Sequence, residues 1–200
     1  MLSAEKITLE EHFVSLYDAY ASFKQERIDG MIAVSNFTKC YKLMYGIPVG
    51  IRAKWILELG VGSNAFSTYI FLEALKVTDG KLISIDINPS YGYGNHPEYD
   101  RNRWNFVCAD STNYSSVGID KGGFDILMID SSHQIEYTRK ELDKYVPLLR
   151  MNGFLYVHDT NEDGVRIPLL EFMQNNPNAL QPFYVEDAPA QMTILRKIGG

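Results

Sequence analysis

The sequence predicts an α/β fold built on a doubly wound, mostly parallel seven-stranded sheet with an antiparallel C-terminal hairpin. Three observations lead to this prediction. Short apolar runs alternate with amphipathic segments of helical period between residues 54 and 175, which is the pattern of β-α units. A glycine-rich turn follows the first apolar run. Two more apolar runs close the chain without a helix between them, which favours a hairpin.

The N-terminal part precedes this alternation and is predicted to be helical. Residues 8–23 carry apolar side chains at helical spacing, and a second short helix is expected over residues 31–43. The glycines and the proline of "YGIPVG" at 45–50 are expected to end that helix. We therefore expect an N-terminal helical cap over residues 1–50 and a catalytic or binding domain over residues 51–200.

The elements of the second part follow from residue type and period. Amphipathic helices are expected at 66–76, 135–149 and 166–174, and Pro147 is expected to kink the last turn of the second one. The hairpin is expected from "PFYVED" and "QMTILRK". The parallel strands are expected at 54–60, 81–87, 105–110, 124–130 and 153–159.

Composition and charge narrow the classes of function. Two hundred residues suit one domain of ordinary size, and a net charge of −6 argues against a nucleic-acid partner. Neither a signal peptide nor a membrane-spanning segment is recognisable, so a cytoplasmic location without a membrane partner is expected. Cys40 and Cys108 suggest no disulfide framework, and Cys108 in "WNFVCAD" is expected to be a small core residue. Oligomeric state is not fixed by the sequence, and a homodimer is compatible with it.

Acidic residues end the predicted parallel strands, in "ELGVG", "DIN", "ADS", "DSSH" and "HDT". In an open parallel sheet, ligands bind beyond the carboxyl ends of the strands, so these residues are candidates for binding and catalysis. Gly60 and Gly62 let a ligand approach the backbone of the first turn. With Ala65 they also fit a dinucleotide fingerprint, but Glu58 would repel a pyrophosphate and would favour a cationic ligand. Asp86 stands at a distance suited to binding ribose hydroxyls, as in either class of nucleotide cofactor.

Taken in order, "ELGVG", "SIDIN", "CADS" and "MIDSSH" resemble the class I S-adenosylmethionine-dependent methyltransferases over residues 50–197. The resemblance implies a Rossmann-like fold and S-adenosylmethionine as cofactor. It implies that Glu58 holds the methionine end of the cofactor and that Asp86 binds the ribose hydroxyls. It also implies that Asp110, with Ser111 beside it, contacts the adenine amine.

The glycine loop departs from the family pattern at one position. Gly60 and Gly62 match the loop, whereas Asn64 replaces its third glycine. Asparagine tolerates a left-handed backbone better than most residues do, so we expect Asn64 to keep the loop geometry and to belong to the cofactor site.

The segments "IDSSHQIEYTRKEL" and "FLYVHDT" are similar to the branch of the family that methylates hydroxyl groups of small molecules. The resemblance to catechol-type enzymes implies that Asp130, which also belongs to the cofactor site, and Asp159 hold Mg²⁺ or another divalent cation. Thr160 stands where those enzymes have a ligand Asn, and His158 is an alternative ligand, although imidazole suits zinc, iron or nickel better. Without a metal, His133 oriented by Asp130 would be the base that deprotonates the acceptor.

A plainer interpretation of "DSSH" stays open. Asp130, Ser131 or Ser132 could cap the helix that starts near Gln134, with His133 an exposed residue of its first turn.

The long aromatic segment 87–104 is interpreted as a flap near the cofactor or the substrate. Its candidate contacts are Tyr91, Tyr93, His96 and Tyr99.

Three functions follow from these patterns. The first is an S-adenosylmethionine-dependent methyltransferase acting on a small hydroxylated acceptor. The second is an NAD(P)-dependent oxidoreductase, but the Tyr-x-x-x-Lys motif of the short-chain type occurs only as "YASFK" at 20–24, before the glycine loop. The third is a non-catalytic protein that binds a ligand through a cofactor fold. The sequence does not identify the acceptor.

Overall fold

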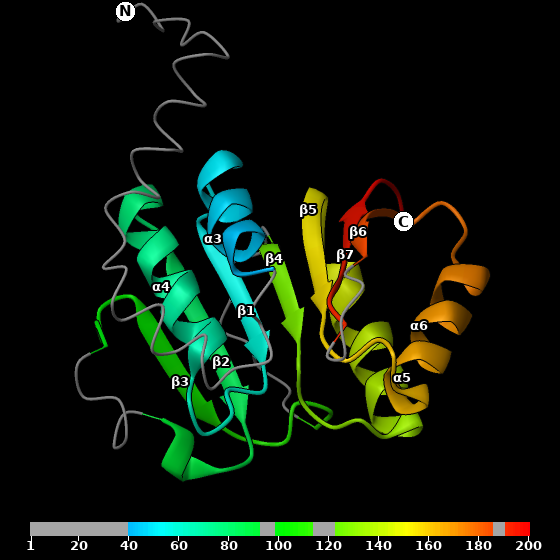
Figure 1. Cartoon of the computed structure of the whole chain (residues 1–200), viewed down its shortest axis with the longest axis horizontal. Helices are drawn as coiled ribbons and strands as arrows, with labels where there is room; N and C mark the ends of the chain where they lie inside the picture. Colours follow the sequence, from blue (N-terminus) through cyan, green and yellow to red (C-terminus); the bar gives the residue numbers. More distant parts are fainter. Residues whose placement is uncertain (1–39, 93–98, 114–122, 186–190) are drawn as a thin grey trace, which may run out of the picture.

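The computed structural model describes residues 40–92, 99–113, 123–185 and 191–200. Within these ranges seven strands form one sheet in the order β3-β2-β1-β4-β5-β7-β6 (Figure 1). Strands β1 to β5 pair in parallel, and β7 is antiparallel to both β5 and β6, which confirms the predicted fold class and its hairpin. The strands are β1 (Trp55–Leu59), β2 (Lys81–Asp86), β3 (Trp104–Cys108), β4 (Phe124–Ile129), β5 (Leu149–Val157), β6 (Leu180–Val185) and β7 (Thr193–Lys197).

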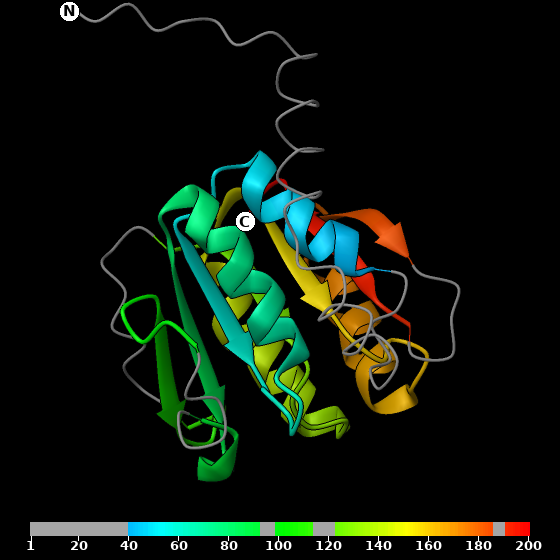
Figure 2. The same cartoon turned by 60° about the vertical axis from the view of Figure 1, so that its left-hand side comes forward.

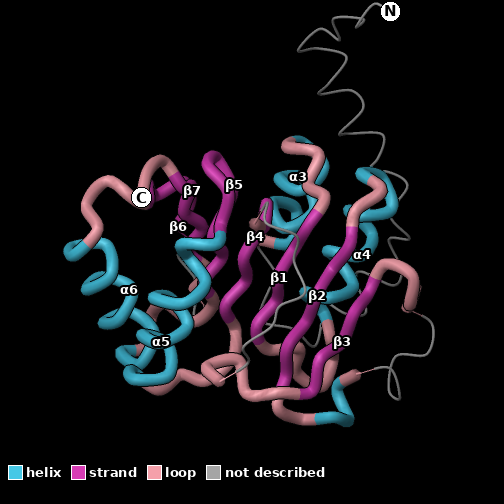
Figure 3. Tube along the Cα trace, turned by 180° about the vertical axis from the view of Figure 1, so that it is seen from behind, coloured by secondary structure: helices cyan, strands magenta, loops and turns pink. Residues whose placement is uncertain are grey.

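Helices cover both faces of this sheet. Helices α3 (Tyr41–Gly50) and α4 (Phe66–Thr78) lie side by side on one face, whereas α5 (Ile135–Tyr145) and α6 (Asp163–Asn175) lie on the other (Figures 1, 2 and 3). Successive side chains of a strand point to opposite faces. In β1, Ile56 accordingly joins the core under α3 and α4, while Leu57 joins the core under α5 and α6.

The predicted helix end at "YGIPVG" is wrong, because α3 runs through this segment. Pro48 cannot donate a backbone hydrogen bond inside the helix, which costs stability. One side of the helix, which includes Met44, Tyr45 and Pro48, is buried, and this packing offsets the loss. Residues 1–39, which hold most of the predicted cap, lie outside the described residues, so the division at residue 50 stays a prediction.

Two further local expectations need correction. The helix predicted over 135–149 ends at Tyr145, and Pro147 lies in a short 3-10 helix, η2 (Val146–Leu148), that leads into β5. Cys108 is exposed instead of buried, because β3 forms one edge of the sheet. Within the described ranges, no helix is both long enough and apolar enough to span a membrane.

Candidate functional site

A cavity of about 640 Å³ opens at the carboxyl ends of β1 to β4, the lower edge of the sheet in Figure 1. Its volume lies in the range of small-molecule sites. Five residues proposed from the sequence for cofactor binding line it, namely Gly60, Gly62, Asp86, Ser111 and Asp130. The other lining residues are Ile85, Ile87, Asn88, Tyr91, Ala109, Ser131, Ser132, Gln134 and Tyr137.

The glycine loop joins β1 to α4 and depends on two left-handed glycines. A Cβ atom at Gly60, whose φ is +88°, would lie 1.9 Å from the backbone oxygen of Asp130, so this glycine lets the ends of β1 and β4 approach each other. A Cβ atom at Gly62, whose φ is +68°, would meet nothing within 4 Å. Gly62 therefore leaves room that a ligand can fill.

Asn64, which replaces the third glycine of the family's loop, does not adopt the left-handed backbone that was expected at this position. The left-handed residue is its neighbour Ala65, with φ of +46° at the N-cap of α4. The Asn64 side chain instead accepts a hydrogen bond from the backbone N–H of Phe66, with 3.3 Å between nitrogen and oxygen. Asn64 thus supports the start of the helix, and it is not among the residues that line the cavity.

Glu58 is fully buried beneath the loop and is also absent from the cavity lining. Its carboxylate oxygens accept hydrogen bonds from three hydroxyl groups, those of Ser67 (2.5 Å), Thr68 (2.7 Å) and Ser84 (2.5 Å). Burial raises the pKa of Glu58 to about 7 despite these hydrogen bonds. The side chain thus ties β1 to α4 and β2 below the loop.

The two acids that follow β2 and β3 differ in their surroundings. Asp86 lines the cavity, and its carboxylate accepts hydrogen bonds from the backbone N–H groups of Val61 and Asn88, each at 2.8 Å. Asp110 does not line the cavity. Its carboxylate accepts hydrogen bonds from the backbone and hydroxyl of Thr112, the amide of Asn113 and the hydroxyl of Tyr137.

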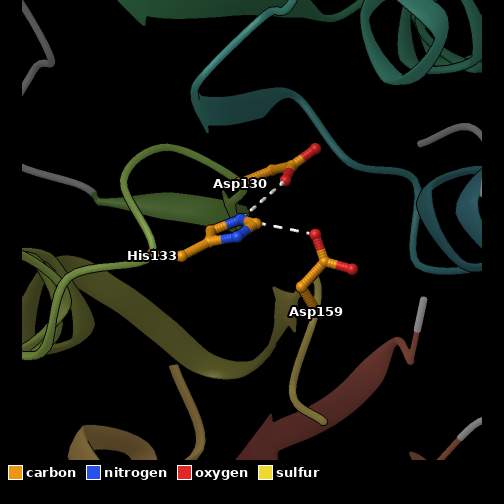
Figure 4. Close-up of side chains that lie close together, drawn as sticks. All are labelled: Asp130, His133 and Asp159. Atoms are coloured by element: carbon orange, nitrogen blue, oxygen red, sulfur yellow. Dashed lines mark ion pairs between the residues drawn. The ribbon is translucent and has the colours of Figure 1, made fainter. Parts of the chain in front are cut away.

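Beside the cavity, Asp130, His133 and Asp159 form a compact cluster (Figure 4). The imidazole ring lies between the two carboxylates, with its Nε2 atom 3.3 Å from Asp159 Oδ2 and 3.9 Å from Asp130 Oδ1. One ligand atom from each residue lies within 4.8 Å of the others, which is close enough for all three to bind one cation. Asp130 belongs both to this cluster and to the cavity lining.

The two other residues considered for a metal site are held differently. His158 is buried, and its Nδ1 atom lies 3.1 Å from Asp130 Oδ1 and 3.0 Å from Asp159 Oδ2. Thr160 is also buried, and its hydroxyl lies 2.8 Å from the hydroxyl of Thr193 and donates to Gln191. These contacts turn Thr160 toward β7, so it does not stand in for the ligand asparagine of the catechol-type enzymes.

Electrostatic interactions within the cluster are strong. Burial alone would raise the pKa of Asp130, but the imidazoles of His133 and His158 lower it to about 2. Asp130, Asp159 and Glu162 raise the pKa of His133 to about 9. Burial lowers the pKa of His158, but Asp130 and Asp159 outweigh it and raise the value to about 10. With no cation bound, both imidazoles are therefore mostly protonated at neutral pH, and His133 would release its proton on binding a cation.

Helix capping does not explain the polar residues of "DSSH". Helix α5 begins at Ile135 with Gln134 as its N-cap, and no side chain caps it. The hydroxyl of Ser131 instead donates to Glu141, and His133 takes part in the cluster. The plainer interpretation of this segment is therefore wrong.

Sequence reasoning missed three residues next to the site, Tyr137, Glu141 and Glu162. Glu162 Oε2 lies 2.9 Å from His133 Nδ1, on the side of the ring opposite the cluster. Tyr137 lines the cavity, and Glu141 is fully buried behind it. Tyr137 and Glu141 lie in a charged, helix-forming stretch and Glu162 lies in the polar turn before α6, and in both places a sequence pattern favours solvent-facing positions. Of the flap residues, Tyr91 lines the cavity and Tyr99 packs against Trp104, whereas Tyr93 and His96 lie outside the described residues.

Comparison with known proteins gives one family and many similar folds. Residues 57–160 match the model of a family described as a methyltransferase domain. No curated protein sequence matches the chain. Among solved structures, the O-methyltransferase from Bacillus cereus in complex with SAH is 13% identical, with a TM-score of 0.65 over 98% of this chain and 94% of that one.

Two other similar structures carry different descriptions. The SAH-bound methyltransferase PaMTH1 from Podospora anserina is 14% identical, with a TM-score of 0.63 over 98% of this chain and all of that one. The N-methyltransferase NodS from Bradyrhizobium japonicum, also with S-adenosyl-L-homocysteine, is 14% identical, with a TM-score of 0.57 over 93% and 98% of the two chains. At such identities the likeness shows the fold alone.

Proposed function

The chain belongs to the methyltransferase-domain family, and on this premise we propose that it is an S-adenosylmethionine-dependent enzyme that methylates a hydroxyl group of a small molecule. The observation that carries the proposal is the position of the Asp130–His133–Asp159 cluster, which shares Asp130 with the cavity. A ligand in the cavity and an acceptor at the cluster would therefore be neighbours. The family assignment sets the oxidoreductase alternative aside.

Several features of the cavity support the proposed binding of the cofactor. Gly62 leaves room beside the backbone, and Asp86 presents a carboxylate that could accept hydrogen bonds from ribose hydroxyls. Glu58 lies below the loop, so we propose that it shapes the loop and does not touch the methionine end of the cofactor. Asp110 likewise accepts hydrogen bonds from four donors. We therefore propose that Ser111 and Tyr137, which line the cavity beyond β3, make the polar contacts to the cofactor there.

The chemistry of methyl transfer explains why the cluster favours an oxygen acceptor. The oxygen of the acceptor forms a bond to the methyl carbon while the carbon–sulfur bond breaks, and S-adenosylhomocysteine leaves. Because a hydroxyl group is a poor nucleophile, it must also give up its proton. A neutral amine does not need to lose a proton before it attacks. A cluster of acids and imidazoles that can bind a cation or accept a proton is therefore expected beside a hydroxyl acceptor more than beside an amine.

The donor set fits a divalent cation. Two carboxylates and one imidazole suit Mn²⁺, Fe²⁺ or Zn²⁺ better than Mg²⁺, which prefers oxygen ligands alone. We propose Asp130, Asp159 and His133 as ligands, with His133 replacing His158, the histidine ligand considered from the sequence. When bound, such a cation lowers the pKa of a coordinated hydroxyl group. Glu162 would hold the ring so that Nε2 faces the cluster.

Calorimetric titration with S-adenosylhomocysteine and with NAD tests the cofactor. We expect S-adenosylhomocysteine to bind and NAD not to bind, and the reverse result would refute the proposal. Methyl transfer would then be measured with methyl-labelled S-adenosylmethionine and a panel of phenols and sugars.

The His133→Ala variant tests the role of the cluster. We expect it to lose at least tenfold in both Mn²⁺ affinity and turnover while it keeps its affinity for S-adenosylhomocysteine, because His133 is not part of the cavity lining. Loss of turnover with unchanged Mn²⁺ affinity would instead make His133 the base. Full activity of the variant would remove it from the mechanism.

A further inference from the structure

Helix α5 directs four polar side chains at one residue, Ser111, which follows β3. Their spacing along the helix places all four on the same side. The hydroxyl of Tyr137 lies 3.0 Å from Ser111 Oγ, and Glu141 Oε1 accepts a hydrogen bond of 2.5 Å from the same atom. The backbone oxygen of Ser111 accepts hydrogen bonds from Lys144 (2.9 Å) and Tyr145 (2.6 Å). Both the side chain and the backbone of Ser111 are thus held by the helix.

Glu141 also reaches the opposite side of the cavity. Its Oε2 atom accepts a hydrogen bond of 2.7 Å from the hydroxyl of Ser131, which follows β4. Strands β3 and β4 are not neighbours, because β2 and β1 lie between them in the sheet. One carboxylate therefore connects the two outer strand ends of the cavity, and both serines that it holds line that cavity.

This arrangement is costly if its only purpose is stability. The Glu141 side chain is fully buried, and burial raises its pKa to about 7 despite the two serine hydroxyls. Burying a carboxyl group is unfavourable compared with burying an apolar side chain of similar size. The neighbouring Leu142 shows that the helix carries an apolar residue where it only packs against the core.

We propose that Glu141 is a positioning residue that fixes the hydroxyl groups of Ser111 and Ser131 toward the nucleoside part of the cofactor. The proposal rests on the proposed binding of S-adenosylmethionine. Glu141 itself does not line the cavity, so it acts through the two serines. Because Asp110 is engaged by its own four donors, the hydroxyls of Ser111, Ser131 and Tyr137 are polar groups of the cavity lining that could contact the nucleoside in its place.

The test compares Glu141→Leu with Glu141→Gln by calorimetric titration with S-adenosylhomocysteine and with adenosine, alongside thermal unfolding. Leucine should weaken both ligands by about tenfold without lowering the unfolding temperature, because two hydroxyl groups lose their partner. Glutamine, which can still accept one hydrogen bond and donate another, should stay within about threefold of the unmodified chain. Glu136→Leu, on an exposed acid of the same helix, serves as the control and should bind as the unmodified chain does.

Unchanged affinity in a folded Glu141→Leu protein would overturn the inference. If that variant does not fold, a double-mutant cycle of Glu141→Met, which keeps the length of the side chain but accepts no hydrogen bond from the serines, with Ser131→Ala replaces it. The two losses in affinity should then be less than additive, because both changes act on the same hydroxyl, and additive losses would overturn the inference. Failure of the unmodified chain to bind S-adenosylhomocysteine would instead reject the cofactor assignment.

Discussion

The buried carboxyl group of Glu58 predicts a pH-dependent stability that one substitution should remove. In the folded chain its pKa is raised to about 7, mainly by burial, whereas an accessible glutamate has a pKa of 4.5. Between these values the folded chain keeps a proton that the unfolded chain has lost. The contribution of Glu58 to stability therefore falls as the pH rises through this window. Glutamine at position 58 has nearly the same shape and does not titrate.

The size of the effect follows from the two pKa values. With about 7 in the folded chain and 4.5 in the unfolded chain, linkage gives a loss on the order of 2–3 kcal/mol between pH 5 and pH 8. Glu141 and the two imidazoles of the site also have raised pKa values, and their contributions likewise fall as the pH rises. These groups are present in both proteins, so the difference between the two stability curves isolates Glu58.

Urea denaturation of the unmodified chain and of Glu58→Gln, at half-unit steps from pH 5 to pH 8, measures this difference. The free energy of unfolding of the unmodified chain should fall by about 2–3 kcal/mol more than that of the variant. Glu136→Gln, which neutralises an exposed acid, should follow the unmodified chain. Parallel curves for Glu58→Gln and the unmodified chain would show that Glu58 is ionised inside the folded protein and that its three hydroxyl donors outweigh burial.

Two further predictions concern the loop and the cluster. Gly60→Ala should cost well over the roughly 1–2 kcal/mol of a left-handed backbone, because its Cβ atom would meet the backbone oxygen of Asp130, whereas Gly62→Ala should cost only about that amount. Equal losses in urea denaturation would mean that the approach of β1 to β4 is unimportant. Glu162→Gln should raise the Kd for Mn²⁺ by about tenfold or more, because Glu162 orients His133. Asp163→Asn, on the next exposed acid, is the control in that titration, and an unchanged Kd for Glu162→Gln would remove Glu162 from the site.

The sequence was sufficient to predict the sheet and the edge at which its site lies. Apolar runs and helical periods are local signals, and the parallel order places Gly60, Asp86 and Asp130 at one edge without knowledge of any contact. The family resemblance added the pairing of Asp130 with Asp159 across β4 and β5. These residues share the property that their place in the fold follows from where their strands end.

The contacts of the other acids could not be predicted in the same way. Glu58 and Asp110 stand at strand ends as expected, but hydroxyl and amide groups distant in sequence occupy their carboxylates. Glu141 lies on the polar helix α5 and Glu162 directly precedes α6, and nothing in the pattern at either place distinguishes an acid that makes internal contacts from a solvated one. The prediction that Cys108 is buried was wrong for a related reason. The residues of its strand are mostly apolar, but the strand lies at the edge of the sheet, where Cys108 is exposed.

Asp130 lies where the cavity and the cluster meet, because its side chain both lines the cavity and belongs to the cluster. In the proposed enzyme, the cation and the cofactor would both act on Asp130, so their binding would be thermodynamically linked. If the cofactor raises or lowers the affinity for the cation by some factor, the cation changes the affinity for the cofactor by the same factor. A single carboxylate would thus couple the two proposed sites, so that filling one of them changes the affinity of the other.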